Sequence, residues 1–271
     1  MGALDGTQAL ITGGDSGLGL ATAQRLAADG CVVTICGRTE EKLKAAAQAL
    51  PDTARYTTCD VRDEDSVRAA VAFAAEGGGL HIAVANAGTG TVGPITTTDL
   101  AAWNSVLETN LTGVFLTFKH AGAAIARAGG GAMVAISSIA GALTHRYMGP
   151  YCVSKAAVEM LVKNTADEMG MVNVRVNAVR PGLVPTDLSV GLTSNPYIQD
   201  DYLAQMPLGR NGTPEDIAEA VRYLVGPESS WTTGQIIAID GGHTLRRGPD
   251  MHGLMEQMAG ADGVRTMLQG G

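Results

Sequence analysis

Short apolar segments alternate with segments of helical periodicity along most of this 271-residue chain. The expected strands lie at residues 8–12, 31–36, 55–59, 80–85, 132–137, 172–179 and 235–239. The expected helices lie at residues 17–29, 40–50, 64–75, 150–169 and 214–225, with one or two more between 100 and 128. Apolar strands that alternate with helices form parallel sheets covered by helices on both faces. The pattern therefore predicts an α/β fold built on a doubly wound parallel sheet of about seven strands.

No linker interrupts this alternation, which predicts a single domain over residues 1–248. The alternation stops there, and residues 249–271 are expected to form a C-terminal tail. The tail places four apolar residues on one face of a short predicted helix: Met251, Leu254, Met255 and Met258. Two interpretations stay open. The tail is frayed or packed on the surface, or it packs on a partner subunit or covers the mouth of a substrate site.

Acidic residues outnumber basic ones by 27 to 19, which gives a formal net charge of −8. Nucleic acids and anionic membranes bind to basic surfaces, so neither is an expected partner. The apolar runs stay well below the ~20 residues of a membrane-spanning helix, and the N-terminus lacks the basic and apolar regions of a secretory signal. We therefore expect a soluble cytoplasmic protein.

The cysteines also favour a reducing compartment. Cys31 and Cys36 share one predicted strand, where five residues span roughly 16 Å, whereas a disulfide requires Cα atoms within about 7 Å. Cys59 and Cys152 complete the set, which has no spacing typical of zinc ligands. All four are expected to be buried free thiols, and no metal site is predicted.

A glycine-rich turn follows the first predicted strand and opens the first predicted helix. It reads TGGDSGLG, from Thr12 to Gly19. Glycines let the backbone approach a pyrophosphate closely, and a helix N-terminus offers N–H groups and the positive end of its dipole. The turn predicts a Rossmann-type dinucleotide site, the alternative being a glycine-rich turn that binds no ligand.

Tyr151 and Lys155, four residues apart, lie on one face of a predicted helix. A nearby ammonium group favours the phenolate and lowers a pKa that starts near ~10, so the phenol can serve as a general acid near neutral pH. Ser138 follows a predicted strand at the sheet edge where open α/β folds bind ligands, and its hydroxyl could hold a carbonyl oxygen. The alternative is an exposed tyrosine–lysine pair without chemistry.

In chain order, these and further motifs resemble the short-chain dehydrogenase/reductase family in its compact single-domain form, over about residues 6–242. The motifs that carry the resemblance are TGGDSGLG (12–19), Asp60, Asn86-Ala87-Gly88, Asn110, Ile136-Ser137-Ser138, YCVSK (151–155), Arg180-Pro181-Gly182 with Thr186, and the closing run 207–242. Much of the chain is similar to 3-oxoacyl-[acyl-carrier-protein] reductases. The resemblance implies a Rossmann-type fold, hydride transfer with a nicotinamide cofactor, and a homotetramer or homodimer.

The resemblance also assigns catalytic roles. Tyr151 would be the proton donor in reduction, or the base in oxidation. Lys155 would bind the nicotinamide ribose and tune Tyr151. Ser138 would orient the carbonyl and stabilise charge on its oxygen, while Ser137 is expected to be structural. Asn110 would support a water that connects Lys155 to solvent.

The cofactor contacts follow from the same resemblance. Asp60 would accept a hydrogen bond from the adenine amine, and Asn86 would stabilise the sheet beside the cofactor. Thr186 would hold the carboxamide, helped by the backbone near Val184. The remaining expected cofactor-binding residues, besides the catalytic tyrosine and lysine, are Gly13, Asp15, Ser16, Gly17, Leu18, Gly19, Val61, Ala87, Gly88, Pro181 and Gly182.

The residues after the second predicted strand favour NADP(H) over NAD(H). Relatives that prefer NAD place an acid there for the ribose hydroxyls, whereas this chain has Gly37, Arg38 and Thr39. The planar guanidinium of Arg38 suits a 2′-phosphate, and Thr39 adds a hydroxyl; the alternative is a solvated loop arginine. One departure is that the glycine-rich turn holds Asp15 and Ser16 where many NADP-binding relatives carry a second basic residue.

The substrate is less constrained, since a 3-oxoacyl thioester, a steroid, a sugar alcohol or another ketone all suit the family. Three residues between Ser138 and Tyr151 could border it: His145, Arg146 and Met148. A surface position is expected for the histidine. A variable lid is expected at residues 183–206, where four residues could make apolar contacts: Leu188, Leu192, Tyr197 and Tyr202. Trp103 and Trp231 are expected to be packing residues.

Other functions are weighed against this hypothesis. A non-catalytic NADP(H)-binding protein would have no use for the complete set of Asn110, Ser138, Tyr151 and Lys155. Enoyl reductases on this fold place the lysine seven residues after the tyrosine, where this chain has Val158. Sugar epimerases have a longer C-terminal domain. An NAD-dependent alcohol dehydrogenase of the same family remains an open alternative.

Overall fold

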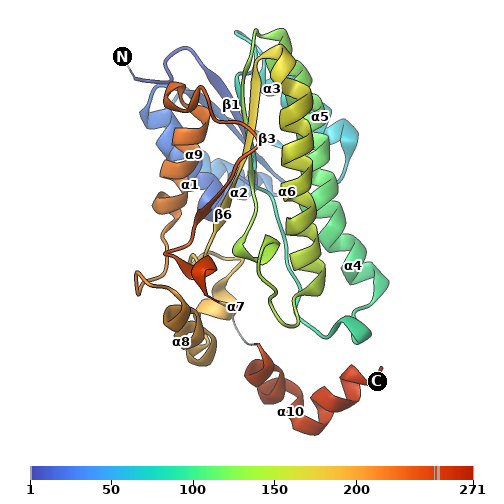
Figure 1. Cartoon of the computed structure of the whole chain (residues 1–271). Helices are drawn as coiled ribbons and strands as arrows, with labels where there is room; N and C mark the ends of the chain where they lie inside the picture. Colours follow the sequence, from blue (N-terminus) through green and yellow to red (C-terminus); the bar gives the residue numbers. More distant parts are fainter. Residues whose placement is uncertain (1, 247, 249–250, 271) are drawn as a thin grey trace.

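A computed structural model describes residues 2–246, 248 and 251–270, and Figure 1 shows its architecture. Seven parallel strands form one sheet in the order β3-β2-β1-β4-β5-β6-β7. The strands are β1 (Gln8–Thr12), β2 (Val32–Gly37), β3 (Arg55–Thr58), β4 (Ile82–Ala85), β5 (Gly131–Ile136), β6 (Val174–Pro181) and β7 (Ile236–Ile239). The predicted doubly wound sheet is therefore confirmed.

Helices cover both faces of this sheet. The described α-helices are α1 (Gly17–Ala28), α2 (Glu40–Ala47), α3 (Glu64–Ala74), α4 (Leu100–Leu107), α5 (Gly113–Arg127), α6 (Gly149–Met169), α7 (Val190–Thr193), α8 (Pro196–Gln205), α9 (Pro214–Val225) and α10 (His252–Leu268). Figure 1 shows α1 and α9 on one face and α3, α5 and α6 on the other, with α7, α8 and α10 beyond the strand ends. Two helical layers thus enclose the apolar strands.

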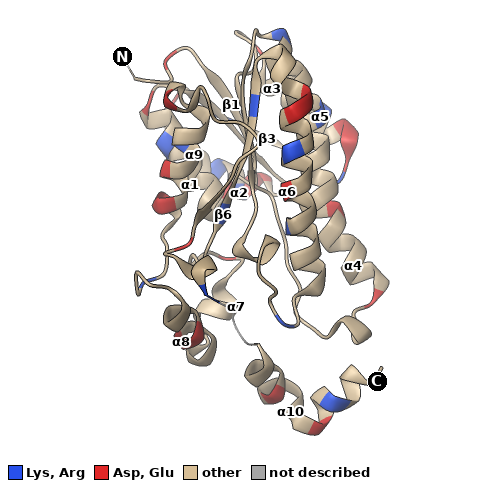
Figure 2. Ribbon diagram, in the orientation of Figure 1, with Lys and Arg blue, Asp and Glu red and all other residues tan. Residues whose placement is uncertain are grey.

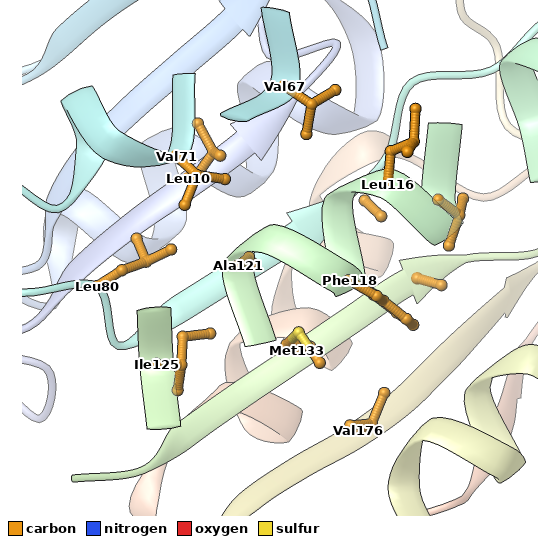
Figure 3. Close-up of a cluster of buried hydrophobic side chains, with 14 of the residues drawn as sticks. Leu10, Val67, Val71, Leu80, Leu116, Phe118, Ala121, Ile125, Met133 and Val176 are labelled. Atoms are coloured by element: carbon orange, nitrogen blue, oxygen red, sulfur yellow. The ribbon is translucent and has the colours of Figure 1, made fainter. Parts of the chain in front are cut away.

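Two buried clusters hold these layers together, one on each face of the sheet. Figure 3 shows the cluster in which side chains of α3 and α5 pack against Leu10, Met133 and Val176 of the strands. The second cluster joins α1, α2 and α9 to the opposite face. Charged residues of both signs lie on the outer helices, as Figure 2 shows. Among the described helices, none has both the length and the apolar composition needed to cross a membrane.

The strand order reverses between β1 and β4. The chain runs outward from β1 to β2 and β3, then returns to place β4 on the other side of β1. At such a switch point the connections diverge to opposite faces and leave a crevice at the carboxyl ends of the strands. The glycine-rich turn after β1 and the segment after β4 flank this crevice.

The helices expected between 100 and 128 are confirmed as α4 and α5, joined by a π-helical turn, Glu108–Thr112. Other expectations are corrected: the strand expected at 80–85 begins only at Ile82. The strand expected from residue 172 starts at Val174, because Asn173 adopts a left-handed conformation with φ 59°. Trp231 is 99% exposed, so its prediction as a packing residue is wrong.

Candidate active site

A cavity of about 760 Å³ opens at the carboxyl ends of the strands. Its walls come from the connections after β1 to β6, from α6, from the predicted lid and from α10. The predicted site residues that line it are Gly13, Asp15, Ser16, Gly17, Leu18, Arg38, Thr39, Asp60, Val61, Asn86, Ala87, Gly88, Ser138, Tyr151, Lys155, Pro181, Gly182, Val184 and Thr186. Gly19 and Asn110 are buried and do not belong to the cavity wall.

The glycine-rich turn requires glycine at three points. Gly13 and Gly17 have φ angles of 60° and 50°, in the left-handed region that favours glycine. A Cβ on Gly19 would lie 2.2 Å from the carbonyl oxygen of Gly13, so a side chain does not fit there. The turn therefore presents bare backbone and the N-terminus of α1 to the cavity, which is the cradle that a pyrophosphate needs.

Thr12 and Asn86 fasten this turn to the neighbouring strand end. Thr12 Oγ1 accepts hydrogen bonds from the backbone N–H groups of Asn86 and Ala87, at 3.0 and 3.1 Å. Asn86 Nδ2 donates to the carbonyl oxygens of Thr12 and Gly13, both at 2.9 Å. These contacts fix the ends of β1 and β4 against each other at the crevice.

Basic side chains gather where β2 and β3 end. Arg38 and Lys42 both line the cavity there. Lys42 was not predicted as a site residue, although it follows Arg38 by four residues at the start of α2. Arg62 also lines the cavity, but it forms an ion pair with Asp60 at 2.6 Å, and this contact lowers the pKa of the Asp60 carboxyl. Arg38 and Lys42 are therefore the cations best suited to an additional phosphate at this end.

A carboxylate from another segment reaches the same end of the cavity. A Cβ placed on Gly37 would lie 3.3 Å from Asp15 Oδ1. The glycine-rich turn thus brings an acid to the end of β2, even though the residue there is a glycine. This arrangement depends on the packing of two separate connections, and no single motif predicts it.

Tyr151 and Lys155 face the cavity from the first turns of α6. Lys155 is buried, and its Nζ donates a hydrogen bond to the carbonyl oxygen of Ile136 at 2.7 Å. The same nitrogen lies 5.6 Å from the centroid of the Tyr151 ring. Ser138, at the end of β5, is hydrogen-bonded to the Tyr151 side chain. The structure therefore brings the three predicted catalytic side chains together on one wall.

Burial shifts the pKa values of both Tyr151 and Lys155, and the shift of Tyr151 is opposite to the predicted one. Burial raises the pKa of the Tyr151 hydroxyl, and the hydrogen bond with Ser138 offsets part of that rise. Burial also lowers the pKa of the Lys155 ammonium group to about 8. The predicted lowering of the Tyr151 pKa is wrong, because burial of the hydroxyl raises the pKa by more than the hydrogen bond with Ser138 lowers it. The phenol keeps its proton at neutral pH, as a proton donor requires.

Asn110 lies in the π-helical turn and connects two walls of the site. Its Nδ2 donates to the carbonyl oxygen of Thr89 at 2.8 Å and to Ser154 Oγ at 3.0 Å, while its Oδ1 accepts from the Thr89 N–H at 2.7 Å. A Cβ on Gly88 would lie 3.5 Å from Asn110 Oδ1 and 3.7 Å from Lys155 Nζ. Asn110 therefore holds the loop after β4 against α6, directly beside the lysine.

A largely buried ion pair that the sequence analysis did not predict lies next to the proposed catalytic wall, which consists of Ser138, Tyr151 and Lys155. Glu159 Oε2 accepts from Arg180 at 2.6 Å, and Glu159 Oε1 accepts from Ser137 Oγ at 2.8 Å. Glu159 follows Lys155 by one helical turn, and Arg180 directly precedes the strand-end residue Pro181. The carboxylate therefore ties α6 to the ends of β5 and β6. The i+4 spacing from Lys155 was the only sequence signal for it.

The predicted lid begins in a compact hydrogen-bonded turn. The Thr186 N–H donates to Ser189 Oγ at 2.9 Å, and Ser189 Oγ in turn donates to the carbonyl oxygen of Val184 at 2.6 Å. A Cβ on Gly17 would come within 3.2 Å of Thr186 Cγ2. The lid thus approaches the glycine-rich turn across the cavity, and the two predicted cofactor-binding segments face each other.

The predicted substrate-bordering residues lie on the side of the cavity near the lid. His145, Met148 and Tyr202 line the cavity. His145 is buried, so its expected surface position is wrong; burial lowers the pKa of its imidazole to about 4. The predicted contacts Leu188 and Leu192 also line the cavity, whereas Arg146 and Tyr197 are not among its lining residues.

Comparisons with known proteins find similar sequences and structures over most of the chain. A family model described as Enoyl-(Acyl carrier protein) reductase matches residues 13–244. The cis-4-hydroxycyclohexanecarboxylate dehydrogenase of Sinomonas cyclohexanicum is 41% identical over 241 residues, which cover 87% of this chain and 96% of that protein. The 3-oxoacyl-[acyl-carrier-protein] reductase FabG of Chlamydia muridarum is 36% identical over 239 residues, which cover 86% of this chain and 96% of that protein. A solved short-chain type dehydrogenase/reductase from Mycobacterium ulcerans superposes with a TM-score of 0.93 at 41% identity, covering 97% of this chain and 98% of that one.

Proposed function

The chain belongs to the short-chain dehydrogenase/reductase family, and from this premise we propose that it interconverts a ketone or aldehyde and the corresponding alcohol with NADP(H). The observation that carries the proposal is the meeting of Ser138, Tyr151 and Lys155 on one wall of the cavity that the glycine-rich turn also lines. A proton donor, a carbonyl-orienting hydroxyl and a dinucleotide cradle together suit hydride transfer.

The residues present fit a nicotinamide dinucleotide. The glycine-rich turn would hold the pyrophosphate, Asp60 the adenine, Lys155 the nicotinamide ribose, and Thr186 with the backbone near Val184 the carboxamide. When bound, the cofactor supplies or accepts the hydride. The side chains of this protein would transfer the proton and stabilise the charge on the substrate oxygen.

In the reductive direction, the Tyr151 hydroxyl gives its proton to the carbonyl oxygen of the substrate. The Ser138 hydroxyl donates a hydrogen bond to the same oxygen and stabilises the charge that develops there. In the oxidative direction, Tyr151 must first have lost its own proton, and the phenolate then takes up the proton of the substrate hydroxyl. We assign Asn110 to the support of a water that connects Lys155 to solvent, because its amide holds the loop beside that lysine.

The preference for NADP(H) rests on the end of the cavity near β2. Arg38 and Lys42 supply two cations there, and Gly37 provides no acid to repel a 2′-phosphate. The nearby carboxylate of Asp15 is the observation that favours the alternative, an NAD-dependent dehydrogenase of the same family. The two candidates differ in which cofactor binds more tightly.

Titration of the purified protein with NADPH and NADH, without substrate, separates them. We expect NADPH to bind at least tenfold more tightly, and we expect Arg38→Asp to abolish that difference because it replaces the phosphate-facing cation. Arg127→Asp is the matched control, since it changes charge equally on an exposed residue at the end of α5, outside the cavity wall. Equal or tighter binding of NADH to the wild-type protein would support the NAD-dependent alternative, and binding of neither would refute the cofactor site.

The substrate class follows less directly. A 3-oxoacyl thioester is one candidate, supported by the 36% identity to FabG. Relatives named for a hydroxycyclohexanecarboxylate show that other alcohols also suit this family. Reduction of 3-oxoacyl thioesters and of simple cyclic ketones with NADPH, measured side by side, would distinguish the two classes by kcat/KM.

We also propose that the chain assembles as a homotetramer or homodimer. Several large apolar side chains are exposed on the outer faces of α4, α5 and α6: Leu100, Phe115, Val153 and Met160. Exposed apolar patches of this kind are typical of protein–protein contacts. Light scattering on the purified protein measures the assembly state, and a monomer at micromolar concentration would contradict this assignment.

A further inference from the structure

The C-terminal helix α10 supplies part of the cavity wall. Figure 1 shows it beyond the carboxyl ends of the strands, between α8 and the loop that precedes α4. At its start, a Cβ on Gly253 would lie 2.5 Å from the ring of Tyr197 in α8. Near its end, Thr96 Oγ1 donates to the carbonyl oxygen of Met267 at 2.5 Å. Gly260, with φ 73°, bends the helix between these two anchors.

Buried side chains fasten α10 to the substrate lid. Met251, Met255 and Val264 are buried in one apolar cluster with residues of the lid. The Tyr147 hydroxyl is hydrogen-bonded to His252 Nδ1 at 2.9 Å. Tyr147 precedes the proposed proton donor by four residues, so α10 is attached close to the catalytic wall. A C-terminal tail that lay loosely on the protein surface would not bury Met251, Met255 and Val264.

Two α10 residues complete the cavity wall, Leu254 and Met258. Met258 is 69% exposed, and two other wall residues, Leu188 in the lid and Val92 after β4, are 57% and 40% exposed. Three separate segments thus contribute exposed apolar side chains to the cavity wall, and these three residues are called the apolar rim below. Apolar surface that converges on a cavity mouth is typical of a site for an apolar ligand.

The charged wall residues lie mainly at the other end. Arg38, Lys42 and Arg62 belong to the segments after β2 and β3, and Lys155 is held at the Ile136 carbonyl. Of the described lid and α10 residues on the wall, Asp187 is the only charged one. His145 adds no cation at neutral pH, because burial holds its pKa at about 4. Among these described wall residues, a carboxylate on a substrate would find no counter-ion.

From the anchored position of α10, the apolar rim and the absence of a cation among these described wall residues, we propose that α10 completes the substrate site within one chain and selects uncharged, largely apolar ketones and alcohols. This inference rests on the proposed oxidoreductase function. It also assigns residues 249–271, over their described part, to the substrate site rather than to a subunit contact.

The test compares two ketones of similar size that differ in charge, methyl 4-oxocyclohexanecarboxylate and 4-oxocyclohexanecarboxylate at pH 7. We expect kcat/KM with NADPH to favour the ester at least tenfold. Calorimetric titration of both compounds into the protein–NADPH complex measures the same preference without turnover.

A positive charge introduced on α10 then tests whether this helix causes the preference for the ester over the carboxylate. Met258→Lys adds a cation to the rim, and we expect it to reduce the preference for the ester at least fivefold. Gln257→Lys is the matched control, because Gln257 is the exposed neighbour on the same helix and does not line the cavity; its preference should stay within twofold of the wild type.

The outcomes separate the two proposals. Equal or better reaction and binding of the carboxylate would overturn the inference and leave the proposed function standing. Binding that favours the ester without any reduction of it would support the inference and count against the proposed function. Binding of neither compound, or equal effects of Met258→Lys and Gln257→Lys, would overturn the role of α10.

Discussion

The proposed cofactor half of the cavity, around the glycine-rich turn, and the proposed substrate half, around the lid and α10, are built in different ways. Around the glycine-rich turn, hydrogen bonds between short neighbouring segments fix the backbone, as Asn86 does for Thr12 and Gly13. Around the lid and α10, apolar side chains from distant segments pack together, and several stay exposed at the rim. The first half depends on backbone geometry and the second on side-chain packing.

This difference explains why the two halves constrain function unequally. A site made from backbone N–H groups and required glycines suits one class of ligand, the dinucleotide. A site made from packed side chains changes its selectivity with each substitution, so similar chains on the same scaffold accept different alcohols. Three changes test this contrast, in order of decreasing expected effect.

The catalytic wall between the halves should show the largest effect. Tyr151→Phe removes the proton donor, so we expect kcat to fall by roughly 10²–10⁴-fold while the affinity for NADPH stays within threefold. Tyr202→Phe is the matched control, because Tyr202 is another tyrosine that lines the cavity and is buried; this variant should keep kcat within tenfold. Steady-state kinetics and cofactor titration measure both. Wild-type kcat in Tyr151→Phe would remove the residue from its assigned role.

Acid should lower the stability of the folded protein through His145, which lies in the proposed substrate half. The pKa of this buried imidazole is lowered to about 4 in the folded protein from 6.5, so the unfolded chain takes up a proton first. Stability from this group is complete above pH 6.5 and is lost as the pH falls toward 4, by up to about 3 kcal/mol at 1.36 kcal/mol per pKa unit. We expect His145→Gln to flatten this part of the stability profile, measured by urea unfolding from pH 7 to pH 4. Parallel profiles for the two proteins would contradict the assignment.

A pair of glycine substitutions compares the halves directly. Gly19→Ala places a methyl group against the Gly13 carbonyl oxygen at 2.2 Å, whereas a Cβ on Gly191 in α7 meets nothing within 4 Å. We expect Gly19→Ala to weaken NADPH binding at least tenfold, because the turn must shift. Gly191→Ala should change both stability and cofactor affinity little, roughly within 0.5 kcal/mol. Cofactor titration of both variants checks this, and a tolerated Gly19→Ala would show that the turn is less constrained than its geometry indicates.

Much of the fold and the cofactor half was predictable from local sequence. The strand and helix alternation reports burial on both faces of the sheet, and the Tyr151–Lys155 spacing places both side chains on one helix face. Most predicted site residues accordingly line the cavity. An observed strand boundary differs from the predicted one where a single residue adopts an unusual backbone conformation, as the left-handed Asn173 does directly before β6.

The features that only the tertiary structure decided join residues far apart in the chain. The hydrogen bond between Tyr147 and His252 spans 105 positions, and the contact of Glu159 with Arg180 joins a helix to a strand end. The burial of His145, the approach of Asp15 to Gly37 and the position of α10 depend likewise on which segments pack together. Local sequence determines backbone geometry and periodicity because each depends on neighbouring residues. The electrostatics and shape of the substrate end depend on the combined desolvation and packing of segments that only the folded chain brings into contact.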